Sequence, residues 1–242
     1  MRRPDPTGPP RTGRLSRLGT RNFLTLTRVE DRDTRGLWLE MTRRVPDGYA
    51  AERVPEVLAL PGVDRATWWD NVHVDRTDLP RVLPEFTLLG VYEVTEDFRP
   101  PSTPPDVDGL HFRRTPRPGQ GSLSGQPTIG LSLVLISPQQ PGDAQALRDW
   151  GDFVHIRHIA EVGVPGYTMI TPYEHADRGD PRYLHFYEMD TDQPEIAFKS
   201  MTPLVAERIG DRGTPAFDEW FWHKSLRIMY VNSFRRLGER SA

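Results

Sequence analysis

The clearest candidates for acid–base chemistry are histidines and tyrosines between residues 150 and 192. His155 and His158 stand three positions apart in a run typical of a polar helix, so we predict that their imidazoles share one face. Imidazoles titrate near neutral pH, and such a pair could divide the roles of acid and base or bind a metal ion. No third ligand stands at a diagnostic spacing, so we predict no metal site. The competing interpretation is a charged surface helix whose histidines pair with acidic neighbours.

The run Arg182–Asp190 is typical of a β-strand, in which successive side chains point to opposite faces. One face would carry Tyr183, His185, Tyr187 and Met189, and the other Leu184, Phe186 and Glu188. A face with a histidine and two tyrosines could line a polar pocket inside a barrel. It could equally pack beneath helices, with each polar tip satisfied locally. The alternation leaves both interpretations open.

A dense aromatic block, Trp220-Phe221-Trp222-His223, precedes the last expected strand, which contains Tyr230. Aromatic side chains of this kind could wall an apolar ligand site. Core packing or a contact between two copies of the chain is the competing interpretation. Trp222 and Tyr230 therefore join the candidate substrate-binding residues.

The composition excludes several classes of function. The 242 residues include no cysteine, which excludes disulfides, thiolate catalysis and cysteine-ligated metals and fits a cytoplasmic location. A net charge of -3 gives no general attraction to nucleic acid or to an anionic membrane, and we predict neither partner. The sequence contains no nucleophile elbow. Its glycine-rich run Gly119–Gly125 lies in a linker, so we reject it as a phosphate loop.

The second half contains the elements that would position these side chains. Its hydrophobic pattern predicts strands over residues 128–137, 167–173, 182–190 and 225–234, and helices over 142–162 and 194–209. The resulting order, β-α-β-β-α-β, is that of a ferredoxin-like unit.

The first half shows a less complete pattern. Residues 1–20 are rich in Pro, Gly and Arg and predict a disordered tail, because they cannot bury enough apolar surface. Beyond it we expect strands over 23–29, 63–70 and 86–95, helices over 37–44 and 49–60, and a short strand over 110–114 in a proline-rich connection. The predicted organisation is a tail (1–20), a first repeat (21–120), a linker (121–127) and a second repeat (128–237).

Two blocks recur in the same order in both halves, which predicts two related ferredoxin-like units. Pro61-Gly62 matches Pro165-Gly166, and Val91–Asp97 (VYEVTED) matches Phe186–Asp192 (FYEMDTD). Where the second copy has His158 before its turn, the nearest residue of the first copy is Arg53. Any active site should therefore be asymmetric and belong to the second half.

A polar helix ending near His158, a Pro-Gly turn, and a Pro-Arg-Tyr-Leu run leading into Tyr187-Glu188 resemble the dimeric α/β barrel superfamily. Within it the sequence is most similar to the EthD-like branch, over about residues 21–236. The resemblance implies that two ferredoxin-like units pair their antiparallel sheets into one barrel with helices outside. It also implies that the helix histidine points towards a cavity, which favours a role for His158. The superfamily includes monooxygenases, cyclases, isomerases and haem enzymes, so the resemblance does not name a reaction.

The leading hypothesis is an α+β protein whose two ferredoxin-like repeats form an intramolecular dimeric α/β barrel that binds a small, largely apolar organic molecule. A cofactor-independent cyclisation, isomerisation or oxygenation would suit a few polar groups in apolar walls. The candidate catalytic residues are His158, Tyr187 and His185, and the candidate substrate contacts are Arg182, His155, Trp222 and Tyr230. A haem-binding barrel and a non-catalytic binding or assembly protein stay open as alternatives. A homodimer of such chains also stays open.

Overall fold

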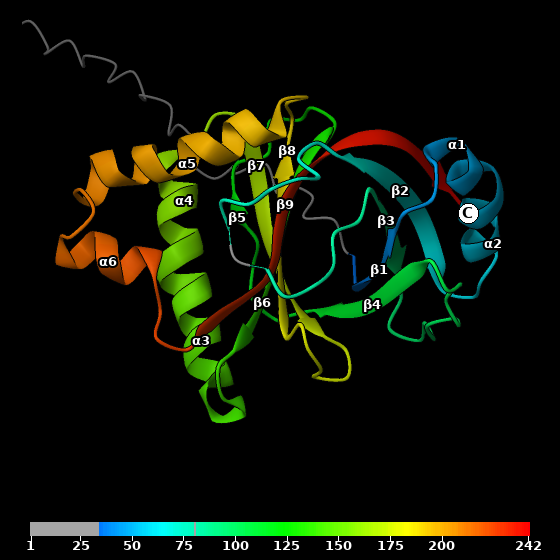
Figure 1. Cartoon of the computed structure of the whole chain (residues 1–242), viewed down its shortest axis with the longest axis horizontal. Helices are drawn as coiled ribbons and strands as arrows, with labels where there is room; N and C mark the ends of the chain where they lie inside the picture. The colour runs from blue at the N-terminus through cyan, green and yellow to red at the C-terminus, as the bar shows by residue number, and fades with distance from the viewer. Residues whose placement is uncertain (1–33, 80) are drawn as a thin grey trace, which may run out of the picture. The chain divides into compact units, whose positions relative to one another are not determined.

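Eight antiparallel strands of the described chain close into one barrel (Figure 1). The structure, a computed structural model, describes residues 34–79 and 81–242. The ring follows the order β4-β1-β3-β2-β9-β6-β8-β7, and pairing of β4 with β7 closes it. A short further strand, β5 (Gln120–Gly121), also pairs with β7. The eight strands are β1 (Gly36–Thr42), β2 (Val63–Asn71), β3 (Leu88–Val94), β4 (Val107–Arg114), β6 (Gly130–Pro138), β7 (Tyr167–His175), β8 (Tyr183–Met189) and β9 (Leu226–Ser241).

Each half of the described chain contributes four neighbouring strands in the same spatial order. The first half supplies β4-β1-β3-β2 and the second supplies β9-β6-β8-β7. When the four strands of each half are numbered 1 to 4 along the chain, both halves have the spatial order 4-1-3-2 of a ferredoxin-like sheet. The two sheets meet where β2 pairs with β9 and where β4 pairs with β7. The fold is therefore the single-chain barrel of two ferredoxin-like units that the sequence predicts.

The helices lie on two sides of this barrel (Figure 1). The first half has α1 (Pro46–Gly48), a π-helical segment (Tyr49–Arg53) and α2 (Val54–Leu58). The second half has a 3-10 turn (Pro141–Asp143), α3 (Ala144–Trp150), a π-helical segment (Gly151–His155), α4 (Ile156–Val162), α5 (Pro194–Ile209) and α6 (Pro215–Phe221). A π-helical segment thus occurs in the first helical region of both halves, and such segments are frequent at functional sites.

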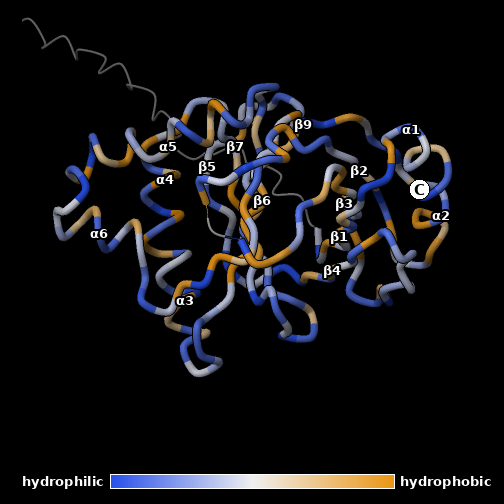
Figure 2. The backbone as a smooth tube through the Cα atoms, in the orientation of Figure 1, coloured by the Kyte–Doolittle hydropathy of each residue, from blue (hydrophilic) through white to orange (hydrophobic). Residues whose placement is uncertain are grey.

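The barrel interior is a packed apolar core. Leu184 and Phe186 of β8 contribute to it, together with residues of the other seven strands of the ring. The opposite face of β8 turns to the helices, where Tyr187 packs with Ile156 and Trp220. The predicted alternation of β8 is therefore confirmed, and its histidine and tyrosine face lies beneath helices rather than inside the barrel. Figure 2 shows hydrophobic residues recurring along the strands and hydrophilic ones in most surrounding loops.

The helix expected over residues 37–44 is wrong, because residues 36–42 form β1. All seven residues of β1 are buried, and a strand covered on both faces loses the alternation that marks a half-exposed one. The expected tail (1–20) and the strand over 23–29 lie outside the described residues. The expected strand over 110–114 is part of the longer β4. No helix of the described residues is both long and apolar enough to cross a bilayer.

Candidate functional site

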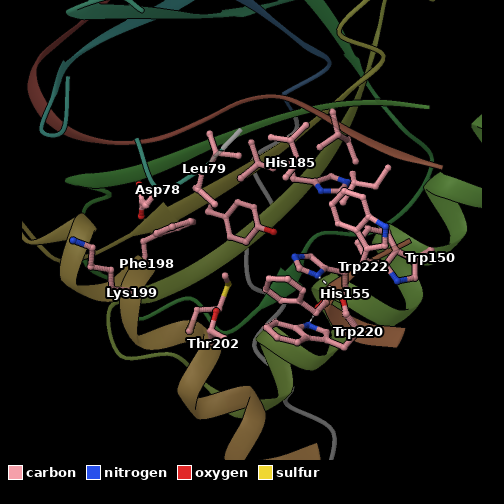
Figure 3. Close-up of a pocket in the computed structure, with 18 residues that line it drawn as sticks. Asp78, Leu79, Trp150, His155, His185, Phe198, Lys199, Thr202, Trp220 and Trp222 are labelled. Atoms are coloured by element: carbon pink, nitrogen blue, oxygen red, sulfur yellow. Dashed lines mark hydrogen bonds between the residues drawn. The ribbon is translucent and has the colours of Figure 1, made fainter. Parts of the chain in front are cut away.

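A cavity of about 430 Å³ lies between the second-half sheet and its helices, outside the packed barrel interior (Figure 3). The outward faces of β6, β8 and β9 form its floor, with Val134, Ile136, His185, Tyr187 and Ile228. Helical residues form its walls, and they include Trp150, His155, Phe198, Met201, Thr202 and Trp220. Pockets that bind drug-sized molecules typically measure about 300–1,000 Å³. The cavity therefore has the size and composition of a small-molecule site.

A stack of aromatic rings forms one wall of the cavity. The ring of His155 lies 5.3 Å from that of Trp220, nearly parallel to it, and 5.1 Å from that of Trp150. The indole N–H groups donate to backbone carbonyls, from Trp150 to Glu219 at 2.6 Å and from Trp220 to His155 at 3.1 Å. In Figure 3 His155 lies between the two tryptophans. Its imidazole is therefore held in one orientation, with its edge rather than its faces free to meet a ligand.

His155 presents an uncharged nitrogen. Its Nδ1 lies 3.0 Å from the carbonyl oxygen of Trp220. Because a carbonyl oxygen only accepts hydrogen bonds, we assign the ring proton to Nδ1, which leaves a lone pair on Nε2. Burial lowers the pKa of His155 to about 4, so the imidazole is neutral at pH 7. The ring is therefore a hydrogen-bond acceptor rather than a cation.

His185 and Tyr187 of β8 add two more polar groups. His185 is only 4 % exposed, and burial lowers its pKa to about 3. Burial raises the pKa of Tyr187, so its hydroxyl keeps its proton and can donate. Behind His185 stands Asp152, whose Oδ1 lies 3.8 Å from Nε2 of the imidazole. The floor of the cavity thus combines a neutral imidazole and a neutral phenol.

A loop of the first half covers one edge of the cavity with Asp78 and Leu79. The buried guanidinium of Arg76 holds this loop, because its Nε donates to Oδ1 of Asn232 at 3.2 Å and the group pairs with Glu195 of α5. Arg76 also lies 5.0 Å from the ring centroid of Phe198. The site is therefore built on the second half but completed by the first.

The corresponding place in the first half is filled. In the first half Glu40 of β1 pairs across the sheet with Gly90 of β3. In the second half the equivalent strands pair Val134 of β6 with His185 of β8. A Cβ on Gly90 would lie 1.8 Å from the hydroxyl of Tyr49, so the tyrosine occupies the space above that glycine. In the second half the large side chain is on the strand and the glycine is on the helical segment. Gly151 lies above His185, and a Cβ built on Gly151 would lie 3.0 Å from Cε1 of His185.

The filling of the first half is held by a buried ion pair. Arg53 and Glu40, 2 % and 0 % exposed in their side chains, lie 2.6 Å apart. Tyr49 donates to Glu40 at 3.0 Å and lies 2.7 Å from the hydroxyl of Tyr92. Arg53 ends its π-helical segment as His155 ends the other. Arg53 is therefore the first-half counterpart of His155. The sequence blocks instead suggest His158 as its counterpart.

Four of the seven candidate residues line the cavity, namely His155, His185, Tyr187 and Trp222. The other three, His158, Arg182 and Tyr230, do not. His155 and His158 point differently because three steps at 3.6 residues per turn end about 60° short of a full turn. The His158 side chain is 30 % exposed and lies 3.9 Å from Glu161. The expectation that His158 faces the cavity is therefore wrong, and His155 takes that place.

Arg182 and Tyr230 lie elsewhere for separate reasons. Arg182 precedes β8 and pairs with Glu174 at 2.6 Å. Tyr230 is fully buried in the barrel core, where it stacks on Phe86 at 4.9 Å and its hydroxyl donates to Glu85 at 2.6 Å. A register shift in β9, between the partners of Leu135 and Ile136, changes which face its residues take. Sequence periodicity does not reveal such a bulge.

Comparisons with known proteins bear on the fold. No protein-family model and no curated protein matches the chain. Among solved structures, an anthrone oxidase-like protein has a TM-score of 0.50 at 13% identity, covering 87% of this chain and 94% of that chain. The fold is a dimeric α/β barrel. A suggested monooxygenase from Lactobacillus acidophilus NCFM has a TM-score of 0.45 at 9% identity, with 86% and 97% covered. A chlorite dismutase from Candidatus Nitrospira defluvii has a TM-score of 0.42 at 8% identity, with 84% and 92% covered.

Some dimeric α/β barrels use haem, but the lining of this cavity does not suit it. Haem carries two propionates, and Lys199 is the single cationic residue among those that line the cavity, where it stands with Asp78. Asp78 already pairs with Arg76. For a metal ion held by side chains alone, which is a separate case from haem, no cluster of three or more histidine and carboxylate side chains occurs within residues 34–79 and 81–242. The lining is suited to an uncharged organic molecule.

Sequence reasoning missed several of the residues that shape the cavity. Phe198, Met201 and Thr202 of α5 line it, as do Asp78 and Leu79 of the first-half loop. The α5 residues follow the helical spacing 198, 201, 202, which places them on one side of the helix and could have indicated a wall of a site. The loop residues carry no local signal, because their position depends on the contacts of Arg76 with Asn232 and Glu195.

Proposed function

We propose that the cavity binds a flat, largely apolar aromatic molecule with an acidic C–H or O–H group, and that neutral His185 accepts its proton. The observation that carries the proposal is an aromatic cavity whose deep polar groups are two uncharged imidazoles and one protonated phenol. Flat rings would lie against the indoles of Trp150 and Trp220 in the offset or edge arrangements that aromatic pairs prefer.

Each polar group has a separate part in this proposal. His185 takes the proton, and Tyr187 donates a hydrogen bond to the oxygen on which negative charge develops. His155, fixed by its neighbouring rings, orients the ligand through the lone pair of Nε2. Removal of a proton from a carbon acid is a first step that a cofactor-independent cyclisation, isomerisation or oxygenation can share. The proposal therefore covers these reaction types without choosing among them.

The neighbour described as anthrone oxidase-like supplies a first compound to test. Anthrone is a flat tricyclic ketone whose methylene group is a carbon acid, so it has the shape and acidity that the cavity suggests.

We also infer that the two halves are tandem copies of one unit, related to the EthD-like branch. The choice of anthrone and the relation between the halves both rest on resemblance. The matching positions of the π-helical segments in the two halves support the duplication.

The decisive experiment measures proton abstraction directly. Anthrone in D₂O with the purified full chain should exchange its methylene protons faster than in buffer alone, as followed by NMR. His185→Gln should slow the exchange about 100-fold or more, because it removes the proton acceptor. His158→Gln is the matched control and should leave the rate unchanged, since His158 lies off the cavity. Equal rates for wild type and His185→Gln would contradict the proposal.

Two further measurements separate the alternatives. Binding of anthrone, seen as quenching of tryptophan fluorescence, without enhanced exchange would favour a non-catalytic binding protein. A Soret band after expression with a supply of haem would favour the haem-binding barrel. We expect binding with enhanced exchange and no Soret band.

A further inference from the structure

We propose that Asp152 is the positioning residue of His185, accepting a hydrogen bond from Nε2–H so that Nδ1 of the neutral ring faces the ligand. The inference deepens the proposed function and rests on it, since it concerns the proton acceptor of the same site. Asp152 is 2 % exposed, and its buried Oδ1 has no hydrogen-bond partner within the described residues. Buried carboxylate oxygens are rarely left unpaired.

A donor that could satisfy this oxygen is His185, whose Nε2 lies 3.8 Å away. A closure of less than about 1 Å would bring the two atoms to hydrogen-bond distance. The other oxygen of the carboxylate is already fixed, because Nη1 of Arg117 donates to Oδ2 at 2.8 Å. Nε of Arg148 lies 4.0 Å from the same oxygen. The carboxylate is therefore anchored on its far side and turned towards the imidazole.

The backbone between the two groups is built for this approach. Gly151 precedes Asp152 in the π-helical segment, and a Cβ there would lie 3.0 Å from Cε1 and 3.4 Å from Nε2 of His185. A larger side chain at position 151 would thus push the imidazole away from the segment. The absence of a side chain at position 151 lets the edge of the ring that carries Nε2 lie against the segment that carries Asp152.

The arrangement also resolves a difficulty in the proposed chemistry. An imidazole that burial keeps neutral is a weak proton acceptor, because its charged form is disfavoured. A carboxylate behind the ring fixes one tautomer and stabilises the imidazolium as it forms. The charged or titratable groups around His185 are Asp152 itself, its partners Arg117 and Arg148, His155, and the protonated phenol of Tyr187. Of these, Asp152 is the carboxylate that can favour proton uptake.

The test reads the tautomer of His185 in the full chain by ¹⁵N NMR of labelled histidines, without any ligand. The His185 signals are identified as those missing from His185→Gln. In the wild type we expect Nε2 to be the protonated nitrogen and Nδ1 the unprotonated one. Asp152→Asn should abolish this single tautomer of His185, because the amide of asparagine can donate a hydrogen bond to the ring as well as accept one. Asp149→Asn is the matched control, since Asp149 also pairs with Arg117, at 2.5 Å, but does not line His185.

The wild-type spectrum alone can overturn the proposal, so a poorly folded variant does not leave it open. A wild-type ring protonated on Nδ1, or a fixed pattern that survives in Asp152→Asn, would show that Asp152 does not position His185. A fixed Nε2–H tautomer in a protein that does not exchange anthrone protons would instead refute the proposed function and leave the positioning intact. Exchange of anthrone protons with an Nδ1–H ring would refute only the positioning.

Discussion

Acidification should destabilise this protein through histidines that the fold keeps neutral, and the structure sets the size of the effect. The unfolded imidazole has a pKa near 6.5, whereas burial lowers the pKa of His155 to about 4 and that of His185 to about 3. Between these values the unfolded chain binds more protons than the folded one. The free energy of unfolding therefore falls as the pH drops from about 6.5 towards 3.

At pH 5 an unfolded histidine is almost fully protonated and these two folded ones are not. Each ring then lowers the free energy of unfolding by about 2 kcal/mol relative to pH 8. The two together account for about 4 kcal/mol, a large part of the 5–15 kcal/mol typical of a folded domain. Burial similarly lowers the pKa of His111 to about 4, which adds a loss of the same sign.

Urea unfolding at pH 8 and pH 5 of the wild type, His155→Gln and His185→Gln measures each contribution. Glutamine does not titrate, so each variant should lose about 2 kcal/mol less than the wild type between the two pH values. The contribution of His111 is common to all three proteins and cancels. The reasoning is refuted if His185→Gln loses as much stability as the wild type, because His185 would then not be buried in its neutral form.

Two further predictions concern the filled first half and the mouth of the cavity. Glu40→Ala should lower the free energy of unfolding by about 3–5 kcal/mol, because it leaves the buried Arg53 with only the largely exposed Glu56, 2.9 Å away, as an ion-pair partner. The double variant Glu40→Leu with Arg53→Met should recover most of that loss in urea unfolding, and an unrecovered loss would argue against the ion pair as the cause. Trp222→Ala should weaken anthrone binding about three- to tenfold in a fluorescence titration. It should change the free energy of unfolding by no more than about 1 kcal/mol, since Trp222 is 50% exposed, and a larger loss would place Trp222 in the core.

The sequence predicts the barrel because its strands carry local signals. The run 183–189 alternates in side-chain character, and the order β-α-β-β-α-β of the second half can be read from periodicity and turn residues. In β1 the same reasoning fails, because burial on both faces removes the alternation and leaves a pattern that also fits a short helix. The partner of Glu40, Arg53, is thirteen residues away on another element, so no local pattern connects the two.

The candidate site is predicted only in part, for geometric reasons. The alternation of β8 places His185 and Tyr187 on one face, but it does not say whether that face meets the barrel interior or the helices. A closed barrel covers both faces, so only the three-dimensional arrangement decides. The choice between His155 and His158 depends on a rotation of about 60° around one helix. The contribution of Asp78 depends on contacts of a first-half loop with β9 and α5.

The contrast between the halves explains why the histidines of the cavity are neutral. In the first half Arg53 can stay charged because Glu40 stands on the neighbouring strand, 2.6 Å from it. In the second half Val134 takes the place of Glu40, so a permanent cation at position 155 would lack that carboxylate. A histidine meets this constraint because it can give up its proton. The first half also shows that this fold can fill the space with Tyr49, so the hollow second half is not imposed by the barrel. Its open space and its uncharged imidazoles follow together from Val134, Gly151 and His155.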